Sequence, residues 1–508
     1  MSSSRTLARD AGIDTGAVPT QRLTAGKLIV LIIGAMTPIA VVGGTMPLGF
    51  AFGGPSTALM FLVAGCIIGI FCVGYSQMVR RITRPGAFYT YVARGLGRPA
   101  GLAVAMIAII GYIGGLTGNF AISGFTVQES LATLFGVAVP WQLIVVCLAV
   151  IVAFITLRSI NVSAGIVFTV VASEVIMLIA LVISIIAEHG SGALSLEVFT
   201  PQVLTLGQWS VAFIFAFLCY QGYEAGALYA PETKNAEKAV PRALYGALVI
   251  ITGLFFLVSW TLTSTVGIEN MTQVVTENGI VGWMFMSISH YLGPVGSWLF
   301  SFILLFAVLA VSVTIVNFMS RYLQSLARDR VLPRYLASTN RVDSPVGAIL
   351  TLLGIATILP LIVPFFGLDP MTDLSSVGFG IGALAATLIQ AITSVAVFVF
   401  FLRRPDSERH WWKTATAPAL AAVLLFGAVV IELLGFQWIT GSEAPWARYL
   451  PLAVFAMALI GVLLALWFRR NRSEIYEDLA AGDTAAEAVE IRRARIARNQ
   501  SEQEASKP

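Results

Sequence analysis

Long apolar runs separated by short polar stretches dominate the hydrophobic pattern of this chain. The hydrocarbon core of a bilayer is about 30 Å thick, so about 20 consecutive apolar residues cross it as one helix. The pattern therefore predicts an all-α integral membrane protein. Twelve runs qualify as transmembrane helices: 28–50, 57–79, 100–124, 140–158, 162–187, 209–230, 242–266, 294–322, 346–366, 374–402, 416–435 and 449–468. The apolar stretch 278–292 is too short to cross, and we predict an interfacial helix there.

The basic residues sort to one side of this predicted membrane. Because successive runs alternate in direction, 30 of the 31 Lys and Arg residues fall in the tails and in the loops of a single side, and Arg448 falls on the other. Cytoplasmic loops carry an excess of Lys and Arg. We therefore expect a multi-pass protein of the cell membrane whose tails, 1–27 and 469–508, are both cytoplasmic. The interleaved Glu and Arg of the second tail suit a solvated segment or a helix against anionic headgroups.

Composition supports the membrane class and narrows the chemistry. The chain is 57% hydrophobic and only 11% charged, whereas soluble domains carry about 25% charged residues. All four cysteines lie in apolar runs and the three histidines show no metal-ligand spacing, so we expect no disulfide framework, no metal and no cofactor. No phosphate-binding loop, nucleophile elbow or His-Glu-x-x-His motif occurs, which argues against an ATP-driven pump and common hydrolases. The polar first 26 residues predict no signal peptide.

The sixth run is interrupted at membrane depth. Gln221, Gly222, Tyr223 and Glu224 follow its apolar first half, and a polar loop comes after them. Non-helical backbone is tolerated at this depth only where it is buried in protein or lines a cavity. A broken membrane helix is the best sequence pointer to the binding site of a transporter. The alternative is an ordinary kinked helix with a packing face of small residues.

The first run is interrupted as well. Pro38 and the pair Gly43–Gly44 fall near its middle, and Pro47 follows. Proline removes a helical donor and clashes with the carbonyl four residues back. Two interrupted helices five spans apart predict an inverted-repeat transporter. Its parts are the five-helix repeats 28–187 and 209–402, followed by helices 11 and 12 in 416–468.

Four sequence motifs of this chain resemble those of a known family. They are PGAFYTYVARGLGRPAG (85–101), SINVSAG (159–165), QGYEAGALYAPETKNAEKAVPRAL (221–244) and SRYLQSLARDRVLPRYLA (320–337). In these stretches the chain resembles the amino acid–polyamine–organocation permeases over about residues 28–402. The resemblance implies a 5+5 inverted-repeat, LeuT-like transporter fold with broken helices 1 and 6. The Gly-Ser-Gly motif of the family is absent from the first span, where IAVVGG (39–44) stands instead.

Helix breaks suit a zwitterionic substrate. The half-helix after a break presents free N–H groups and a positive dipole end to a carboxylate, and the half-helix before it presents carbonyls to an ammonium group. The resemblance implies the same arrangement, with the carboxylate on span 1 and the amine on span 6. Leu218 stands where relatives often place an aromatic gate, with Phe217 and Tyr220 beside it. The predicted substrate-binding residues are Val41, Val42, Gly43, Gly44, Thr45, Phe217, Leu218, Cys219, Tyr220 and Gly222.

Two acids inside predicted spans are candidates for proton coupling. Glu174 lies near the middle of span 5, and a carboxylate at the bilayer centre costs about 2.5–3.5 kcal/mol on insertion scales. The resemblance implies that several relatives carry a lysine in the equivalent stretch, where it occupies the place of a sodium ion. An acid at this position departs from that pattern. Glu224 matches an acid of the family. Each could instead be structural: Glu174 as a paired or protonated acid, Glu224 as a tie between helices.

Six polar residues of other spans are candidates for lining a cavity. The alternative for each is a hydrogen bond between helices, which is the commoner role of such groups. The hydroxyl groups on span 8 could also serve as oxygen ligands of a sodium ion, so a sodium site is a further alternative. The candidates are Tyr112 and Asn119 on span 3, Ser312, Thr314 and Asn317 on span 8, and Gln390 on span 10.

The sequence thus favours a secondary active transporter of amino acids that works by alternating access and is coupled to protons. The alternatives are a carrier or exchanger of polyamines or other organic amines and, in a different class, a membrane-embedded enzyme or a channel. An enzyme would need clustered acid–base or metal groups, and a channel a symmetric pore motif; the sequence offers neither. The expected partners are a small amino acid or amine, the lipid bilayer and protons or another coupling ion, and no nucleic acid.

Overall fold

The computed structural model describes residues 23–81, 87–158, 164–224, 226, 233–328, 330–405, 409–441, 445–473 and 476. These residues form helices and one isolated β-bridge between Leu23 and Thr233. Within them, nine helical stretches are long and apolar enough to cross a membrane. The first stretch, Ala25–Arg81, holds two of the predicted spans, and Trp141–Leu157 and Trp209–Leu218 are shorter apolar helices. The all-helical membrane class is therefore confirmed, and the count of twelve remains a prediction.

The elements follow the predicted runs with shifted ends. In the first part of the chain they are α2 (Ala25–Met36), α3 (Pro38–Ala40), η1 (Val41–Thr45), α4 (Met46–Leu48), η2 (Gly49–Gly53), η3 (Gly54–Ser56), α5 (Thr57–Arg81), α6 (Ala87–Leu96), α7 (Arg98–Phe135), α8 (Trp141–Leu157), α9 (Ala164–His189), η4 (Gly190–Leu194), η5 (Leu196–Phe199) and η6 (Pro201–Leu204).

The second part begins with the buried α10. Its elements are α10 (Trp209–Leu218), α12 (Ala236–Val266), α13 (Met271–Glu277), α14 (Ile280–Arg328), η8 (Arg334–Ala337), α15 (Val346–Ile362), η9 (Val363–Phe366), η10 (Pro370–Leu374), α16 (Ser375–Leu402), η12 (Trp411–Thr416), α17 (Ala417–Gly435), η13 (Phe436–Trp438), η14 (Ala447–Tyr449) and α18 (Leu452–Asn471).

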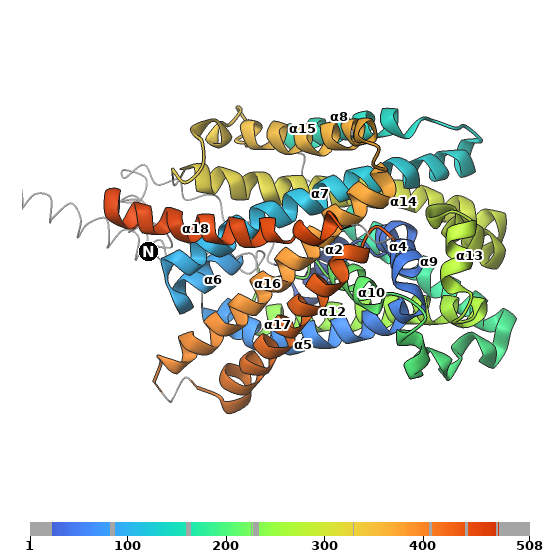
Figure 1. Ribbon diagram of the computed structural model, residues 1–508, viewed down its shortest axis with the longest axis horizontal. Helices are drawn as coiled ribbons and strands as arrows, with labels where there is room; N and C mark the ends of the chain where they lie inside the picture. Colours follow the sequence, from blue (N-terminus) through green and yellow to red (C-terminus); the bar gives the residue numbers. More distant parts are fainter. Residues whose placement is uncertain are drawn as a thin grey trace, which may run out of the picture.

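The helices run roughly along the long axis of the molecule, and α10 lies in its interior against α5, α16 and α17 (Figure 1). Every residue from Val211 to Leu218 is buried. A helix that is apolar all round suits such a central position. The paired helices α8 and α15 lie at one edge of the bundle (Figure 1).

Glycines bring α7 and α16 into close contact. A Cβ atom on Gly378 would lie 2.5 Å from the carbonyl oxygen of Gly114, and one on Gly118 would lie 2.8 Å from that of Ser375. Small residues let membrane helices approach each other in this way. The contact fixes the wall of α7 that faces the centre of the bundle.

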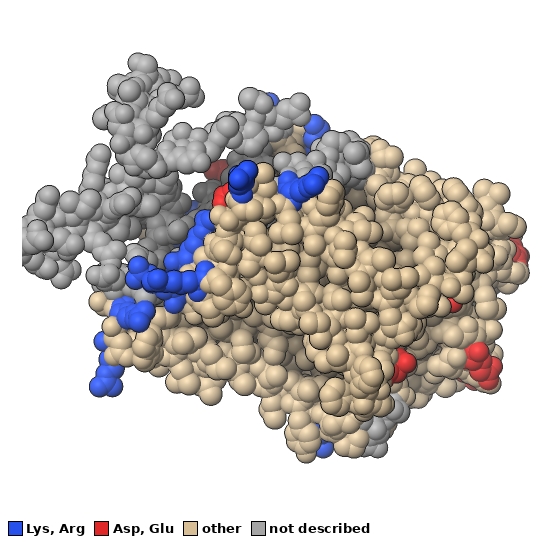
Figure 2. Space-filling view, turned by 90° about the horizontal axis from the view of Figure 1, so that it is seen from above, with Lys and Arg blue, Asp and Glu red and all other residues tan. Residues whose placement is uncertain are grey.

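The charged side chains separate along the long axis. On the face seen in Figure 2, Lys and Arg gather toward the left end, and the few charged residues toward the right end are Asp and Glu. We call the left end the basic end and the opposite one the outer end. The separation matches the loop assignment made from the sequence, because the basic loops were all predicted on one side.

At the outer end, a short helix precedes a sharp bend in α14. Gly293 has non-helical backbone (φ 67°, ψ −174°) and Pro294 follows, so Ile280–Leu292 forms a separate segment. This agrees with the short helix expected at 278–292. Trp283 of this outer segment packs edge-on against Phe50 of η2, with ring centroids 5.7 Å apart.

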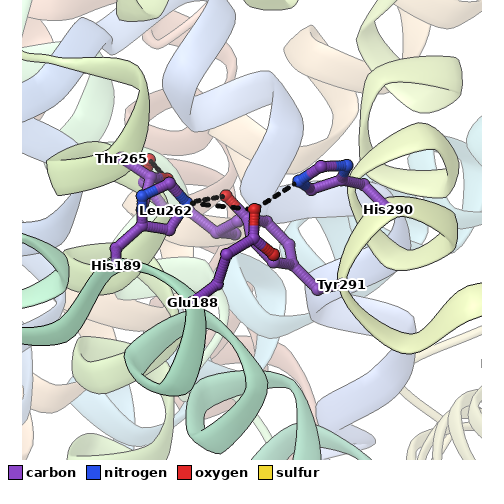
Figure 3. A network of polar contacts seen from close by, with 6 residues as sticks. All are labelled: Glu188, His189, Leu262, Thr265, His290 and Tyr291. Carbon is purple, nitrogen blue, oxygen red and sulfur yellow. Dashed lines mark hydrogen bonds and ion pairs between the residues drawn. The ribbon is translucent and has the colours of Figure 1, made fainter.

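Polar contacts tie the same outer segment to the end of α9 (Figure 3). His290 Nε2 lies 2.9 Å from Glu188 Oε1, and His189 Nε2 lies 3.2 Å from the Tyr291 hydroxyl. The Glu188 and His290 side chains are 45% and 61% exposed. An ion pair this exposed contributes about 0–1 kcal/mol. The buried aromatic packing on Phe50 therefore holds the segment more strongly than these contacts do.

Candidate functional site

The first membrane helix is broken at Thr37 and not at its glycine pair. Thr37 has left-handed backbone (φ 42°, ψ 71°), α2 ends before it and Pro38 opens the next segment. A residue before proline is disfavoured in the helical region, and proline is suited to the first position of a helix. Gly43 and Gly44 instead lie in the π-helical turn η1. A Cβ at Gly43 would lie 3.1 Å from Leu304, so this glycine provides packing space.

The sixth helix is broken after Leu218. Residues 219–224 form turns, with the Gln221 N–H bonded to the Leu218 carbonyl, and Gly222 has a positive φ of 108°. A Cβ atom on Gly222 would lie 2.7 Å from the carbonyl oxygen of Ala35. The two breaks therefore meet backbone to backbone. Residue 225 and residues 227–232, which include the end of the predicted span 209–230, lie outside the described residues.

A cavity of about 460 Å³ opens beside this junction. Its walls come from α2 to η1, α7, the turns after α10, α14 and Phe379 of α16. The lining residues that the sequence predicted are Val41, Gly44, Thr45, Tyr112, Asn119, Leu218, Cys219, Gly222, Glu224, Thr314 and Asn317. The volume suits a small organic molecule, since ligand pockets measure about 300–1,000 Å³.

Glu224 is the acid in the described wall of the cavity. It is 8% exposed. Its Oε1 atom accepts a hydrogen bond of 3.0 Å from the Tyr112 hydroxyl, and its Oε2 atom accepts one of 3.0 Å from the Gly222 N–H. A buried carboxylate needs such partners. Glu224 thus ties α7 to the second break.

Two amide side chains make further ties around the cavity. Asn119 Nδ2 donates to the Ser312 hydroxyl at 2.9 Å and so joins α7 to α14. Gln221 Nε2 donates to the Gly382 carbonyl at 2.8 Å and so joins the second break to α16. A Cβ atom added to Gly382 would lie at an ordinary contact distance, 3.5 Å, from the Leu218 side chain. The polar groups of the wall are therefore positioned by contacts between helices.

The remaining wall is mostly apolar. Met36, Leu116, Ile122, Val308 and Ile315 are among its members. Toward the basic end, the lining includes Phe318 and Arg321, and the Arg321 side chain is exposed. The cavity thus combines a few fixed polar groups with an apolar surface, which is the usual composition of a small-molecule site.

Seven predicted residues do not line the cavity: Val42, Gly43, Phe217, Tyr220, Glu174, Ser312 and Gln390. Tyr220 is fully buried and donates a hydrogen bond of 2.6 Å to the Phe61 carbonyl on α5. Phe217 is 2% exposed and packs on Phe213. Of the three side chains considered as a gate, Leu218 alone reaches this cavity's lining.

Glu174 lies next to the first break, behind the wall. It is 2% exposed and accepts a hydrogen bond from the N–H of Ile39 in the segment that follows Thr37. Its Oε2 atom has no hydrogen-bond partner among the described residues. The carboxyl group thus satisfies one of the amide groups that a helix start leaves free.

The sequence reasoning passed over Thr37, Arg321 and Glu432. The Thr-Pro pair was the signal for the first, because proline restricts its predecessor. Glu432 is an acid inside an apolar run, which was itself a signal. It is fully buried on α17 and accepts a hydrogen bond of 2.7 Å from the Thr387 hydroxyl on α16. Among the described residues, no group of three or more His, Cys, Asp or Glu side chains could hold a metal ion.

Comparison with known proteins gives the family. A family model described as amino acid permease matches residues 23–460. The chain is similar to the branched-chain amino acid permease BcaP of Lactococcus lactis subsp. cremoris, with 25% identity over 81% of this chain and 89% of the relative. The chain is also similar to BcaP of Bacillus subtilis, with 22% identity over 90% of this chain and 94% of the relative. A third relative, the low-affinity putrescine importer PlaP of Escherichia coli, is 24% identical over 36% of this chain and 42% of the relative. The chain therefore belongs to the amino acid permease family, within the amino acid–polyamine–organocation superfamily.

Proposed function

We propose that this protein is a secondary active transporter that moves amino acids across the cell membrane by alternating access, driven by a proton gradient. The single observation that carries the proposal is the meeting of the two helix breaks, Gly222 against the Ala35 carbonyl, at the wall of a cavity of about 460 Å³. Broken helices that converge on a cavity are the usual binding sites of inverted-repeat carriers.

The breaks give the substrate an orientation. The carboxylate would lie toward the start of the segment after Thr37, where a helix dipole favours negative charge. This moves the predicted carboxylate position from Val41–Thr45 toward Thr37–Val41, because the break lies earlier than the glycine pair. The ammonium group would lie toward the carbonyl ends of α2 and α10.

The chemistry of the wall favours a neutral amino acid with an aliphatic side chain. Most lining residues are apolar, and both oxygens of Glu224 already accept hydrogen bonds. A polyamine needs carboxylates for its ammonium groups, and the described wall offers it only Glu224, which it would share with Tyr112 and the Gly222 N–H. Two relatives are named branched-chain amino acid permeases, which agrees with this choice. The similarity to a putrescine importer keeps the organic amine carrier as the alternative.

Glu174 is the proposed coupling group. It is buried beside the first break and bonds the Ile39 N–H. Protonation would weaken this bond to the amide, since a neutral carboxyl is a poorer acceptor than a carboxylate. A change in the start of this segment would then alter the substrate site. Glu224 is assigned to the structural tie with Tyr112, and its titration during transport is the alternative.

The topology follows from the charge separation. We propose twelve spans, two five-helix repeats in 28–187 and 209–402, and both termini in the cytoplasm. Figure 2 supports this orientation, because the basic residues gather at one end. Phe50 and Trp283 pack together at the outer end. In this arrangement the cavity is reached from the cytoplasmic side past Arg321.

Uptake into proteoliposomes tests the function. Radiolabelled leucine and putrescine would be offered with and without an inwardly directed proton gradient, using wild type, Glu174→Gln and the matched control Glu129→Gln, an exposed acid on α7. We expect gradient-stimulated leucine uptake in wild type and in the control. Glu174→Gln should lose the stimulation and keep leucine exchange without a gradient. Putrescine uptake without leucine uptake would overturn the substrate class, and undiminished stimulation in Glu174→Gln would overturn the coupling role.

A further inference from the structure

Two adjoining hollows at the basic end are lined by cationic side chains. The larger, about 510 Å³, lies between Arg80 of α5 and the first turns of α12. The smaller, about 210 Å³, lies between the start of α2 and the same turns and includes Lys234. The two share Lys238 and Arg242. We call the two hollows together the basic groove.

The charge of the groove is one-sided. Arg80, Lys234, Lys238 and Arg242 are all exposed, and no described residue of the lining is acidic. None of the four forms an ion pair with another described residue. Four cations in a hollow attract an anion, and a phosphate group offers several acceptor oxygens to such donors.

The groove continues along one face of α12. Lys238, Arg242, Tyr245 and Val249 follow one another at intervals of four, three and four residues, so they share one face of the helix. Tyr245 is half-buried and shares a hydrogen bond with Ser76 of α5. Val249 is 71% exposed. The order along this face is thus cationic, aromatic, apolar.

This order matches the layers of a phospholipid. Tyrosine sits at the level of headgroups, with lysine and arginine outside it and apolar side chains beside the acyl chains. Basic pockets between helices on the cytoplasmic side bind anionic headgroups. A free phosphate ion would use the cations and make no use of Val249.

We propose that the basic groove binds the phosphate headgroup of an anionic phospholipid, whose acyl chains lie along Tyr245 and Val249. The bound lipid joins α5 to α12, because Arg80 comes from the first helix and Lys238 and Arg242 from the second. The leaflet is the cytoplasmic one if the proposed orientation holds. The binding itself does not depend on which substrate is transported.

Native mass spectrometry of the detergent-purified full chain tests the proposal. Phosphatidylglycerol and phosphatidylcholine would be titrated onto wild type and onto the triple variant Arg80→Gln, Lys238→Gln, Arg242→Gln. The matched control replaces Arg334, Arg341 and Lys413, three exposed basic residues elsewhere in the chain, by glutamine. We expect phosphatidylglycerol to bind wild type more tightly than phosphatidylcholine, and the triple variant to bind it at least about tenfold more weakly, with the control within about twofold of wild type.

Three results would overturn the proposal. Equal loss in the control would assign the effect to net charge, and no loss in the triple variant would place the lipid elsewhere. Displacement of the lipid by inorganic phosphate at equal concentration would make the ligand a free anion. The Val249→Ser variant adds a second test, since it should weaken the binding of the lipid and leave the binding of inorganic phosphate unchanged. Leucine uptake measured on the same preparations separates a failure of this inference from a failure of the transport function.

Discussion

The hydroxyl of Tyr112 donates a hydrogen bond of 3.0 Å to Glu224 Oε1, across the cavity wall from α7 to the second helix break. The Gly222 N–H holds the other oxygen. The one acid in the described cavity wall is therefore already bonded before any substrate arrives. Both donors are uncharged and fix the position of the carboxylate at the second break, and this tie can be tested by changing either donor residue.

Replacing Tyr112 with phenylalanine removes the donor and keeps the ring. A hydrogen bond to a charged group contributes about 1.5–3 kcal/mol. We expect leucine uptake to fall roughly tenfold, because the second break loses its tie to α7. Putrescine should compete better with leucine in the variant, since Oε1 becomes available to an ammonium group. Competition uptake measures both, with Tyr449→Phe, an exposed residue outside the cavity, as control. Unchanged leucine uptake would contradict the tie.

Gly222→Ala should strongly reduce transport. The backbone there has φ 108°, and the added Cβ would lie 2.7 Å from the Ala35 carbonyl oxygen. Both the conformation and the contact disfavour a side chain. Leucine uptake per folded molecule should fall at least about tenfold. Gly354→Ala on α15 is the control, because nothing lies within 4 Å of its Cβ position. Similar uptake by both variants would mean that the breaks need not meet.

The contact between Glu188 and His290 should slow the opening of the outer segment, because it ties this segment to the end of α9 (Figure 3). His189 and Tyr291 are the other groups at this contact.

His290→Gln weakens this contact. Leucine uptake by the variant should therefore exceed wild-type uptake, by no more than about fivefold because the pair is exposed. Uptake by the two proteins under the same gradient gives the ratio. His410→Gln, at the start of η12, is the control. Uptake equal to or below that of wild type would refute the contact as a brake.

The sequence predicted the class of fold, and eleven of the predicted site residues line the cavity. The reasons lie in particular residues. The apolar runs predicted the helices, and Gly222 with its polar neighbours predicted the second break. Both signals could be read because each lies within one short stretch of the sequence. The first break was assigned partly to Gly43–Gly44, although the left-handed residue is Thr37. A glycine pair permits a break in the helix, but it also permits close packing of another helix. At Gly43 the space is used for packing, by Leu304, which is distant in the sequence.

Side-chain direction was the other limit. Leu218 and Tyr220 are two residues apart, yet one lines the cavity and the other bonds the Phe61 carbonyl. Ser312 and Asn119 were both candidates for the lining, and they bond each other, with Ser312 behind the wall. Which way a side chain turns at a broken helix depends on the turn geometry and on other helices. Neither can be read from spacing along the chain.

Protection of Cys219 tests the central claim most directly. This cysteine lies in the lining at the second break. In a variant whose other three cysteines are replaced, a small thiol reagent should label it, and leucine should slow the labelling in proportion to its binding. A variant that keeps only Cys147, which is exposed on α8 outside the cavity, should be labelled at a rate that leucine leaves unchanged. Labelling of Cys219 at the same rate with and without leucine, in a preparation that transports leucine, would show that the substrate binds elsewhere.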